Sequence, residues 1–326
     1  MRGARTRLAS WSFEDHIMKV GINNILVTGA CGQLGSEMQL LAALHPRYQW
    51  FFTDVVPSSP SSQRFAGGSS PAVAFTVSPL DITDPAAVSD YVEDNAIDLI
   101  VNCAAYTAVD RAEADEEKAN QLNAVAPGYL AAAIERRGGQ LIHISTDYVF
   151  DGTAHTPYTE DCPASPATAY GRTKLAGERA VLAANSSAMI VRTAWLYSRF
   201  GNNFVKTMLR LGREKGELGV VFDQIGTPTY ARDLAAAIMA AVEQGIQPGI
   251  YHFTDEGVTS WYDFTKAIHR IAGITTCRVS PLHTAEYPTP AARPHFSVLD
   301  KTKIKQTYGV EIPYWEESLR ECISHL

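Results

Sequence analysis

The sequence has no long apolar run and no surplus of positive charge. Among its 326 residues, 28 Lys and Arg stand against 35 Asp and Glu, which gives a net charge of −7. A negative field repels nucleic-acid phosphates and anionic membrane surfaces. No uninterrupted apolar stretch reaches the ~18 residues that a transmembrane helix needs. We therefore expect neither nucleic acid nor a membrane as a partner.

Cysteine is scarce and follows no pattern. The five cysteines, an odd number, include no CxxC pair and lie beside no histidine cluster; they are Cys31, Cys103, Cys162, Cys277 and Cys322. Disulfide frameworks and zinc sites use paired or closely spaced sets. The pattern therefore predicts reduced thiols and a cytoplasmic protein.

Residues 1–18 lack the apolar core that a signal peptide needs. They contain Arg2, Arg5 and Arg7 together with two aromatic residues. We expect an N-terminal extension that takes no part in the chemistry.

A glycine-rich turn follows the first apolar segment. Ile25–Val27 predicts a strand, and Gly29, Gly32 and Gly35 come before apolar positions spaced as on a helix. In this context the glycines allow a tight turn, the close approach of a phosphate and the packing of the helix on its strand. The helix N-terminus then faces a pyrophosphate. The segment predicts a dinucleotide site.

Two acidic residues are expected near the adenosine half of that dinucleotide. Asp54 ends the apolar strand Gln49–Thr53; an acid there binds a ribose 2′-hydroxyl and disfavours a 2′-phosphate. NADH should therefore be accepted, and NADPH stays open. Asp81 lies in the loop after a further strand at Ala74–Val77, although helix capping alone explains an Asp in such a loop. Residues 55–72 are expected to form a surface loop.

Strands alternate with helices over the first part of the chain. Further buried runs are Leu99–Val101, Leu141–Ile144 and Met189–Val191. The alternation predicts an α/β fold with a Rossmann-type doubly wound parallel sheet in residues 19–195. In residues 196–326 it loosens, which predicts a smaller substrate-binding lobe, with about 219–253 returning to the Rossmann core.

An acid/base group is predicted where the strand at 141–144 ends. Tyr170 and Lys174 are four residues apart, so on a helix both side chains lie on one face. A nearby ammonium lowers the pKa of a phenol, and the hydroxyl of Thr146 adds a neutral hydrogen bond at the strand end. The three suit proton transfer to or from an alcohol or ketone oxygen. Tyr-x-x-x-Lys alone also occurs by chance, as a half-buried Tyr beside a solvated Lys.

Three neighbouring features are read differently. His143 is expected to be a packed or exposed strand residue and no catalyst, because Tyr170 already has an activator. Asn123, within a long helix predicted for 111–137, is either solvated or a brace for the active-site strand. Residues 151–168, rich in Pro, Thr and acid, suggest a loop over the pocket.

The ordered set of motifs resembles the dTDP-4-dehydrorhamnose reductase family of the extended short-chain dehydrogenase/reductase superfamily. The motifs are Gly29-x-x-Gly32-x-x-Gly35, Tyr170-x-x-x-Lys174 and the segments 102–113, 145–152, 170–178, 192–197, 201–204, 223–229 and 288–294. The resemblance covers residues 24–326.

The resemblance implies a site residue by residue. The implied catalytic residues are Thr146, Tyr170 and Lys174. The implied cofactor contacts are Gly29, Gly32, Gln33, Leu34, Gly35, Asp54, Asp81, Ile82, Ala105, Tyr106, Thr107, Ile144, Tyr170 and Lys174. The implied substrate contacts are Thr146, Asp147, Trp195, Asn202 and Arg293, although Trp195 also suits a core position and Arg293 a lobe surface.

The implied activity is NAD(P)H-dependent reduction of the 4-keto group of dTDP-4-dehydro-L-rhamnose. Two alternatives stay open: a non-catalytic nucleotide-binding subunit like the β subunit of methionine adenosyltransferase, and a reductase or epimerase of another nucleotide sugar. Some members of the family dimerise through magnesium. Arg232 stands where one acidic ligand is expected, so no metal is predicted and a homodimer stays possible.

Overall fold

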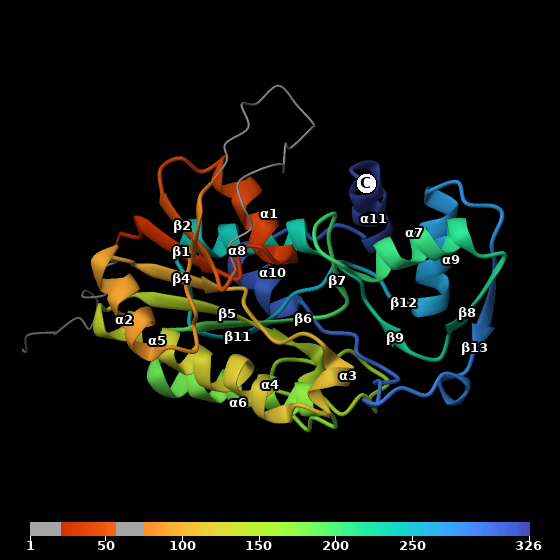
Figure 1. Cartoon of the computed structure of the whole chain (residues 1–326), viewed down its shortest axis with the longest axis horizontal. Coiled ribbons are helices and arrows are strands. Elements are labelled where there is room, and N and C mark those ends of the chain that lie inside the picture. Colours follow the sequence, from red (N-terminus) through yellow and green to blue (C-terminus); the bar gives the residue numbers. More distant parts are fainter. Residues whose placement is uncertain (1–20, 57–74) are drawn as a thin grey trace, which may run out of the picture.

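The structure is a computed structural model and describes residues 21–56 and 75–326. The expected extension at 1–18 and nearly all of the loop predicted for 55–72 therefore lie outside the described residues. A seven-stranded parallel sheet forms the centre of the molecule (Figure 1). In spatial order its strands are β11 (Gly249–His252), β6 (Met189–Thr193), β5 (Gln140–Thr146), β4 (Leu99–Asn102), β1 (Asn24–Thr28), β2 (Gln49–Asp54) and β3 (Val77–Pro79).

Helices cover both faces of this sheet, because its central strands are apolar on both sides. Alternate residues of β1 enter different cores: Ile25 and Val27 belong to one apolar cluster and Leu26 to the other. The first core is closed by α1 (Gln33–Ala42), α8 (Ala231–Gln244) and α10 (Thr302–Tyr308), and the second by α2 (Pro85–Asp94), α5 (Ala126–Arg136) and α6 (Ala169–Ala184). The predicted doubly wound α/β fold is confirmed.

The long helix predicted for 111–137 is broken, which corrects that expectation. Helix α3 (Val109–Ala112) ends early, α4 (Glu116–Asn120) follows, and a π-helical turn at Gln121–Val125 joins it to α5. Asn123 lies in this wider turn and holds the backbone of Tyr106 on both sides, accepting from its N–H at 2.8 Å and donating to its carbonyl oxygen at 3.1 Å. π-turns of this kind occur mostly where a helix carries a functional constraint.

A smaller lobe lies beside the carboxyl end of the sheet (Figure 1). Its helices are α7 (Phe204–Glu214), α9 (Trp261–Ile271) and α11 (Trp315–Ser324), and β8 (Glu217–Val221) pairs in parallel with β13 (Arg278–Leu282). An aromatic-rich cluster of its own fills the lobe. Two short pairs lie between the lobe and the sheet, β7 (Leu196–Tyr197) with β10 (Thr229–Tyr230) and β9 (Ile225–Gly226) with β12 (Thr259–Ser260).

The segment predicted to return to the Rossmann core divides in two. Within 219–253, α8 and β11 join the helix layer and the large sheet, whereas β8 pairs inside the lobe. Helix α10, which comes from the C-terminal part of the chain, also packs against the large sheet. Residues 151–168 do not cover the large cavity, which corrects that expectation: Tyr158 bridges to Leu299, and Glu160 accepts from the backbone N–H of His252.

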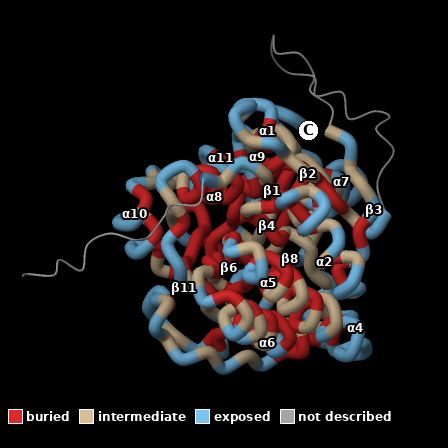
Figure 2. Tube along the Cα trace, turned by 90° about the vertical axis from the view of Figure 1, so that its left-hand side faces the viewer, coloured by how far each residue is buried: buried red, intermediate tan, exposed pale blue. Residues whose placement is uncertain are grey.

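Burial is deepest in the sheet and on the inner sides of its helices, as Figure 2 shows. Helices α5 and α6 each contain a glycine, but only the one in α6 is required for close packing. A Cβ on Gly177 would overlap the carbonyl oxygen of Asn123 in the π-turn, whereas a Cβ on Gly128 would meet only the Ala180 methyl at 3.4 Å.

Gly177→Ala and Gly128→Ala should therefore have opposite effects. The first should lower the free energy of unfolding by about 1–3 kcal/mol through overpacking, and the second should leave it unchanged or raise it by up to ~1 kcal/mol through helix propensity. Urea denaturation followed by circular dichroism measures both. Equal changes in the two variants would contradict the close approach of α6 to the π-turn.

Candidate active site

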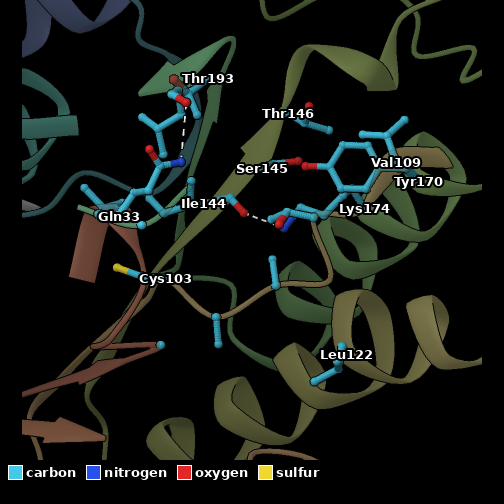
Figure 3. Close-up of a pocket in the computed structure, with 18 of the residues that line it drawn as sticks. Gln33, Cys103, Val109, Leu122, Ile144, Ser145, Thr146, Tyr170, Lys174 and Thr193 are labelled. Atoms are coloured by element: carbon cyan, nitrogen blue, oxygen red, sulfur yellow. Dashed lines mark hydrogen bonds between the residues drawn. The ribbon is translucent and has the colours of Figure 1, made fainter. Parts of the chain in front are cut away.

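One large cavity, of about 990 Å³, opens at the carboxyl edge of the sheet and reaches the lobe. Most of the predicted site residues line it: Gly29, Gly32, Gln33, Leu34, Asp54, Asp81, Ile82, Ala105, Thr107, Ile144, Thr146, Asp147, Tyr170, Lys174, Trp195 and Asn202. Figure 3 shows several of these side chains around the cavity. The structure thus brings together residues from the whole length of the Rossmann core and from the start of the lobe.

Three predicted contacts lie outside this lining. Gly35 packs on the carbonyl oxygen of Gly29, where a Cβ would not fit, so its part is to hold α1 against β1. Tyr106, like Tyr170, packs against a small cluster of buried alanines. Arg293 forms a 2.7 Å ion pair with Asp110 and lines a separate recess of about 30 Å³.

The glycine turn presents backbone to the cavity. Gly29 has φ +66°, and a Cβ there would meet the backbone of Ala104, so only glycine fits. Helix α1 begins at Gln33, and no side chain caps its N-terminus. Such an end, with its free N–H groups and positive dipole, favours phosphate oxygens.

The acidic pair beside the turn is fixed by backbone donors. Asp54 accepts from the N–H of Cys31 at 2.9 Å and from the N–H of Val55 at 2.8 Å. Asp81 accepts from the N–H and the hydroxyl of Thr83, at 2.9 and 2.7 Å. The Asp81 carboxylate thus closes a local turn, while Asp54 stands at the carboxyl end of β2, where a ribose would lie.

Tyr170 lies in the first turn of α6 and points toward Thr146 (Figure 3). The helix is capped by Thr168, whose hydroxyl accepts from the N–H of Gly171 at 3.1 Å. Burial raises the pKa of Tyr170 to about 12, although its hydrogen bond with Thr146 lowers it. This corrects the expectation that Lys174 lowers that pKa. The phenol is therefore neutral, with a proton to give.

Lys174 is directed to the end of β5. Its ammonium is buried and donates to the carbonyl oxygen of Ile144 at 2.6 Å, the bond drawn in Figure 3. Burial lowers the pKa of Lys174 to about 8, against the pull of Glu178. His143 lies 3.5 Å from the ammonium on its other side. His143 is thus a packed strand residue as predicted, but one in contact with the acid/base group.

Asp147 follows Thr146 at the same strand end. Its Oδ1 accepts from the Thr146 hydroxyl at 3.0 Å, and no protein group meets hydrogen-bond geometry at its buried Oδ2, although the Ser297 hydroxyl is near enough to lower the pKa of the carboxyl. Burial raises the pKa of Asp147 to about 6, and the Thr146 bond opposes this. An unpaired buried oxygen beside Tyr170 is suited to bind a polar ligand group.

Trp195 forms one wall of the cavity in a strained conformation. Its φ of +48° is rare for a large residue. The ring stacks on Trp261 with 3.5 Å between centroids and 8° between planes. Sequence analysis missed Trp261, because nothing in its helix α9 distinguishes a stacking partner from a core aromatic.

A buried ion pair supports the strand ends next to Tyr170. Arg192 donates to both carboxylate oxygens of Glu178, at 2.9 and 2.7 Å, and the Ser145 hydroxyl donates to the same carboxylate at 2.5 Å. Bidentate geometry of this kind is the strong form of an arginine–carboxylate pair. It ties β5 and β6 to α6. Sequence analysis also missed these residues, together with the cavity residues Cys103, Leu122 and Thr193, of which the first and last are recognisable as strand-end positions.

Arg232, from which the absence of a metal was predicted, has an acidic partner in the structure. Arg232 pairs with Glu321, and its charge lowers the pKa of the nearby Glu37, which burial raises. A guanidinium there repels a divalent cation. Within residues 21–56 and 75–326, no group of three His, Cys, Asp or Glu side chains has the placement to hold a metal ion.

A glycine turn, a strand-end hydroxyl and a Tyr–Lys pair around one cavity define an extended short-chain dehydrogenase/reductase. The family described as RmlD substrate binding domain matches residues 23–326. The chain therefore belongs to this family, that of the dTDP-4-dehydrorhamnose reductases.

Similar proteins support the assignment. A dTDP-4-dehydrorhamnose reductase of Burkholderia thailandensis is 38% identical over 93% of this chain and 98% of its own. A probable dTDP-4,6-dihydroxy-2-methyloxan-3-one 4-ketoreductase of Streptomyces antibioticus is 41% identical over 91% of this chain and 93% of its own. The crystal structure of the Bacillus anthracis dTDP-4-dehydrorhamnose reductase in complex with NADP has a TM-score of 0.80 and 34% identity, covering 94% of this chain and 100% of that one.

None of the helices in the described part of the chain combines the length and the apolar character needed to cross a membrane.

Asp147→Asn should stabilise the protein in a pH-dependent way. The folded-state pKa is about 6, against an ordinary 3.8, so between these values the folded state binds a proton that the unfolded state has lost. Stability conferred by that proton is lost as pH rises through 6. We expect Asn to raise the free energy of unfolding by about 3 kcal/mol above pH 6 and by almost nothing near pH 4. Denaturation at several pH values checks this, and a gain that does not depend on pH would contradict it.

Proposed function

We propose that the protein catalyses the NAD(P)H-dependent reduction of the 4-keto group of dTDP-4-dehydro-L-rhamnose to give dTDP-L-rhamnose. The observation that carries the proposal is the neutral, partly buried Tyr170, which shares one cavity with the uncapped helix end after the glycine turn. Family membership supports the substrate class, because the relatives act on dTDP-linked 4-ketosugars by their names.

The residues of the cavity fit a dinucleotide. Gly29 and Gly32 leave room for a pyrophosphate at the start of α1, and Asp54 supplies an acceptor for a ribose hydroxyl. Ala105 and Thr107, at the end of β4, line the way toward Tyr170. A nicotinamide cofactor bound there supplies the hydride.

Three residues then serve the proton chemistry. When substrate binds, the Thr146 hydroxyl exchanges its bond to Asp147 for one that it donates to the substrate carbonyl oxygen. Tyr170 gives its proton to that oxygen as negative charge develops. Lys174 is anchored by its hydrogen bond to the carbonyl oxygen of Ile144, and its ammonium supplies positive charge near the cofactor ribose. Asp147 and Trp195 face the sugar, with Asn202 near the diphosphate end. Arg293 has Asp110 as its partner and lies in the neighbouring recess, so we assign it no phosphate contact.

Tyr170→Phe should lower kcat by about 10²- to 10⁴-fold, because it removes the general acid. Cofactor binding should stay within about 3-fold, because the ring and the glycine turn are retained. Stopped-flow turnover and fluorescence titration with NADPH measure the two quantities. The matched control is Tyr129→Phe, in α5 outside the cavity lining, for which kcat should be unchanged. A Tyr170→Phe enzyme with near-normal turnover would remove the proposed acid.

Asp54 should set the balance between the two nicotinamide cofactors. A carboxylate at this place binds the 2′-hydroxyl of NADH and repels the 2′-phosphate of NADPH. Asp54→Asn should therefore raise the ratio of kcat/KM for NADPH to that for NADH by about 10-fold or more. The ratio is read from initial rates with both cofactors. A fall in the ratio would show that Asp54 does not face the adenosine ribose.

A second substrate is also supported by a specific relative. The Streptomyces antibioticus protein reduces, by its name, a differently substituted dTDP-linked ketosugar. Incubation with several dTDP-4-ketosugars and either cofactor separates the possibilities. Stoichiometric cofactor oxidation with dTDP-4-dehydro-L-rhamnose alone supports our assignment, whereas oxidation with another ketosugar identifies that sugar as the substrate. Interconversion of sugars without net cofactor oxidation indicates an epimerase. Cofactor binding without turnover indicates a regulatory protein. We also place the reaction in the cytoplasm, because an odd number of scattered cysteines is typical of proteins with reduced thiols.

A further inference from the structure

A chain of four buried side chains runs behind the cavity, from the glycine-turn strand to Lys174. It consists of Thr28 on β1, Asn102 on β4, His143 on β5 and Lys174 on α6, each at most 1% exposed. Of these only Lys174 lines the cavity. Parallel register brings them together, since Thr28 is paired with Asn102 and Asn102 with His143 across adjacent strands.

Hydrogen-bond direction along this chain is fixed by one backbone group. The N–H of Ala104 and the hydroxyl of Thr28 both donate to Oδ1 of Asn102, at 3.2 and 2.7 Å. A backbone N–H can only donate, so the oxygen of the amide faces Ala104 and the NH₂ group faces His143. The NH₂ group therefore donates to Nδ1 of His143 at 2.9 Å.

This contact settles which nitrogen of His143 carries the proton. Nδ1 accepts a hydrogen bond, so the ring is neutral and its one proton lies on Nε2. Nε2 faces the Lys174 amine at 3.5 Å, while the amine donates to the Ile144 carbonyl oxygen at 2.6 Å. An N–H group and an ammonium are both donors and form no hydrogen bond with each other, which agrees with the longer of the two distances.

We propose that His143 is a positioning residue for the reaction: held as the neutral Nε2–H tautomer by Asn102, it directs a donor at Lys174 and so weakens the hold of Lys174 on its proton. The neutral amine has a lone pair that can accept from Nε2–H, whereas the ammonium has none. The contact therefore favours the amine. The role in catalysis rests on the proposed function, but the tautomer and its effect on Lys174 do not.

The electrostatics of the site agree with this geometry. Burial and the charge of Lys174 hold the pKa of His143 well below its ordinary value, so the ring stays neutral. Burial lowers the pKa of Lys174, and Glu178 on the same helix opposes it. The other ionisable groups on the elements packed around the carboxyl end of β5 are Tyr170 on α6, Cys103 after β4, Asp147 after β5 and Arg192 on β6, which Glu178 neutralises.

A weakly held proton on Lys174 serves the turnover cycle. Each reduction takes one proton from Tyr170 and leaves a phenolate. Lys174 can return a proton to that phenolate, becoming a neutral amine, and then regains one from solvent, so that the site ends with both groups protonated. His143 stabilises the intermediate neutral amine.

Nuclear magnetic resonance of the ligand-free protein tests the inference without any turnover. In the unmodified chain with ¹⁵N-labelled histidine, one ring, absent from the spectrum of His143→Asn, should show the Nε2–H pattern from pH 6 to pH 9. With ¹³C-labelled lysine, the ¹³Cε signal that Lys174→Arg removes should titrate. In His143→Asn its midpoint should rise by about 1 pH unit. The Asn oxygen can still accept from Asn102, but the shorter Asn side chain has no atom in the place of Nε2, so the donor next to Lys174 is lost.

His269→Asn is the matched control, because this buried histidine lies in the lobe and contacts the carbonyl oxygen of Met208. It should leave the Lys174 midpoint unchanged. The inference is overturned if the His143 ring carries its proton on Nδ1 or becomes charged in this pH range, or if the Lys174 midpoint does not rise in His143→Asn. If the His143 variant fails to fold, through-bond assignment of the His143 ring in the unmodified protein still gives the tautomer, which decides the question.

The pH profile of the enzyme tests the role in the reaction. The basic limb of kcat should move to higher pH by a similar amount in His143→Asn, while the KM for the cofactor changes by less than about 2-fold. A basic limb that stays in place would remove His143 from the reaction. Lack of turnover by the unmodified protein would refute the proposed function and leave the tautomer result intact.

Discussion

The bond from Lys174 to the carbonyl oxygen of Ile144 joins the two elements that carry the chemistry. Helix α6 presents Tyr170 and Lys174 on one face, and β5 ends in Thr146. Together with the bond from Ser145 to Glu178, this buried contact holds the helix face against the strand end. A charged amine is stable in such a place only because a carbonyl oxygen satisfies it. The position of the phenol relative to Thr146 follows from it.

Burial has opposite consequences for the two members of the Tyr–Lys pair. It raises the pKa of Tyr170, since the phenolate is poorly solvated, and lowers that of Lys174, since the ammonium is poorly solvated. Both shifts favour neutral groups. The Glu178–Arg192 pair next to them is equally buried, but there each group faces an opposite charge across two hydrogen bonds, which offsets the cost of burial.

The sequence was sufficient to predict the layers of the fold and most of the cavity. Runs of β-branched residues with a glycine turn have few foldable arrangements, and the carboxyl ends of parallel strands meet at one edge, so residues such as Asp54, Thr146 and Tyr170 could be placed together. Contacts that depend on the partner of a particular side chain could not be predicted in this way. Arg293 is directed by Asp110, far away in the chain, and Tyr106 is turned by Asn123, whose π-turn has no local sequence signal. The return of residues 219–253 to the core was predicted, and α8 and β11 do return there. The packing of α10 on the sheet was not predicted, because α10 follows a long excursion of the chain into the lobe.

His143 shows where reading residues one at a time stops being informative. A lone histidine in an apolar strand is most often a packed residue, and this one is packed. Its chemistry comes from register: β1, β4 and β5 align Thr28, Asn102 and His143 side by side, and the backbone N–H of Ala104 orients the amide between them. The same parallel pairing that builds the sheet thus sets the proton on one ring nitrogen and aims it at Lys174. The cavity surface supplies the groups that touch the ligands, and the sheet interior behind it supplies the electrostatics that those groups need.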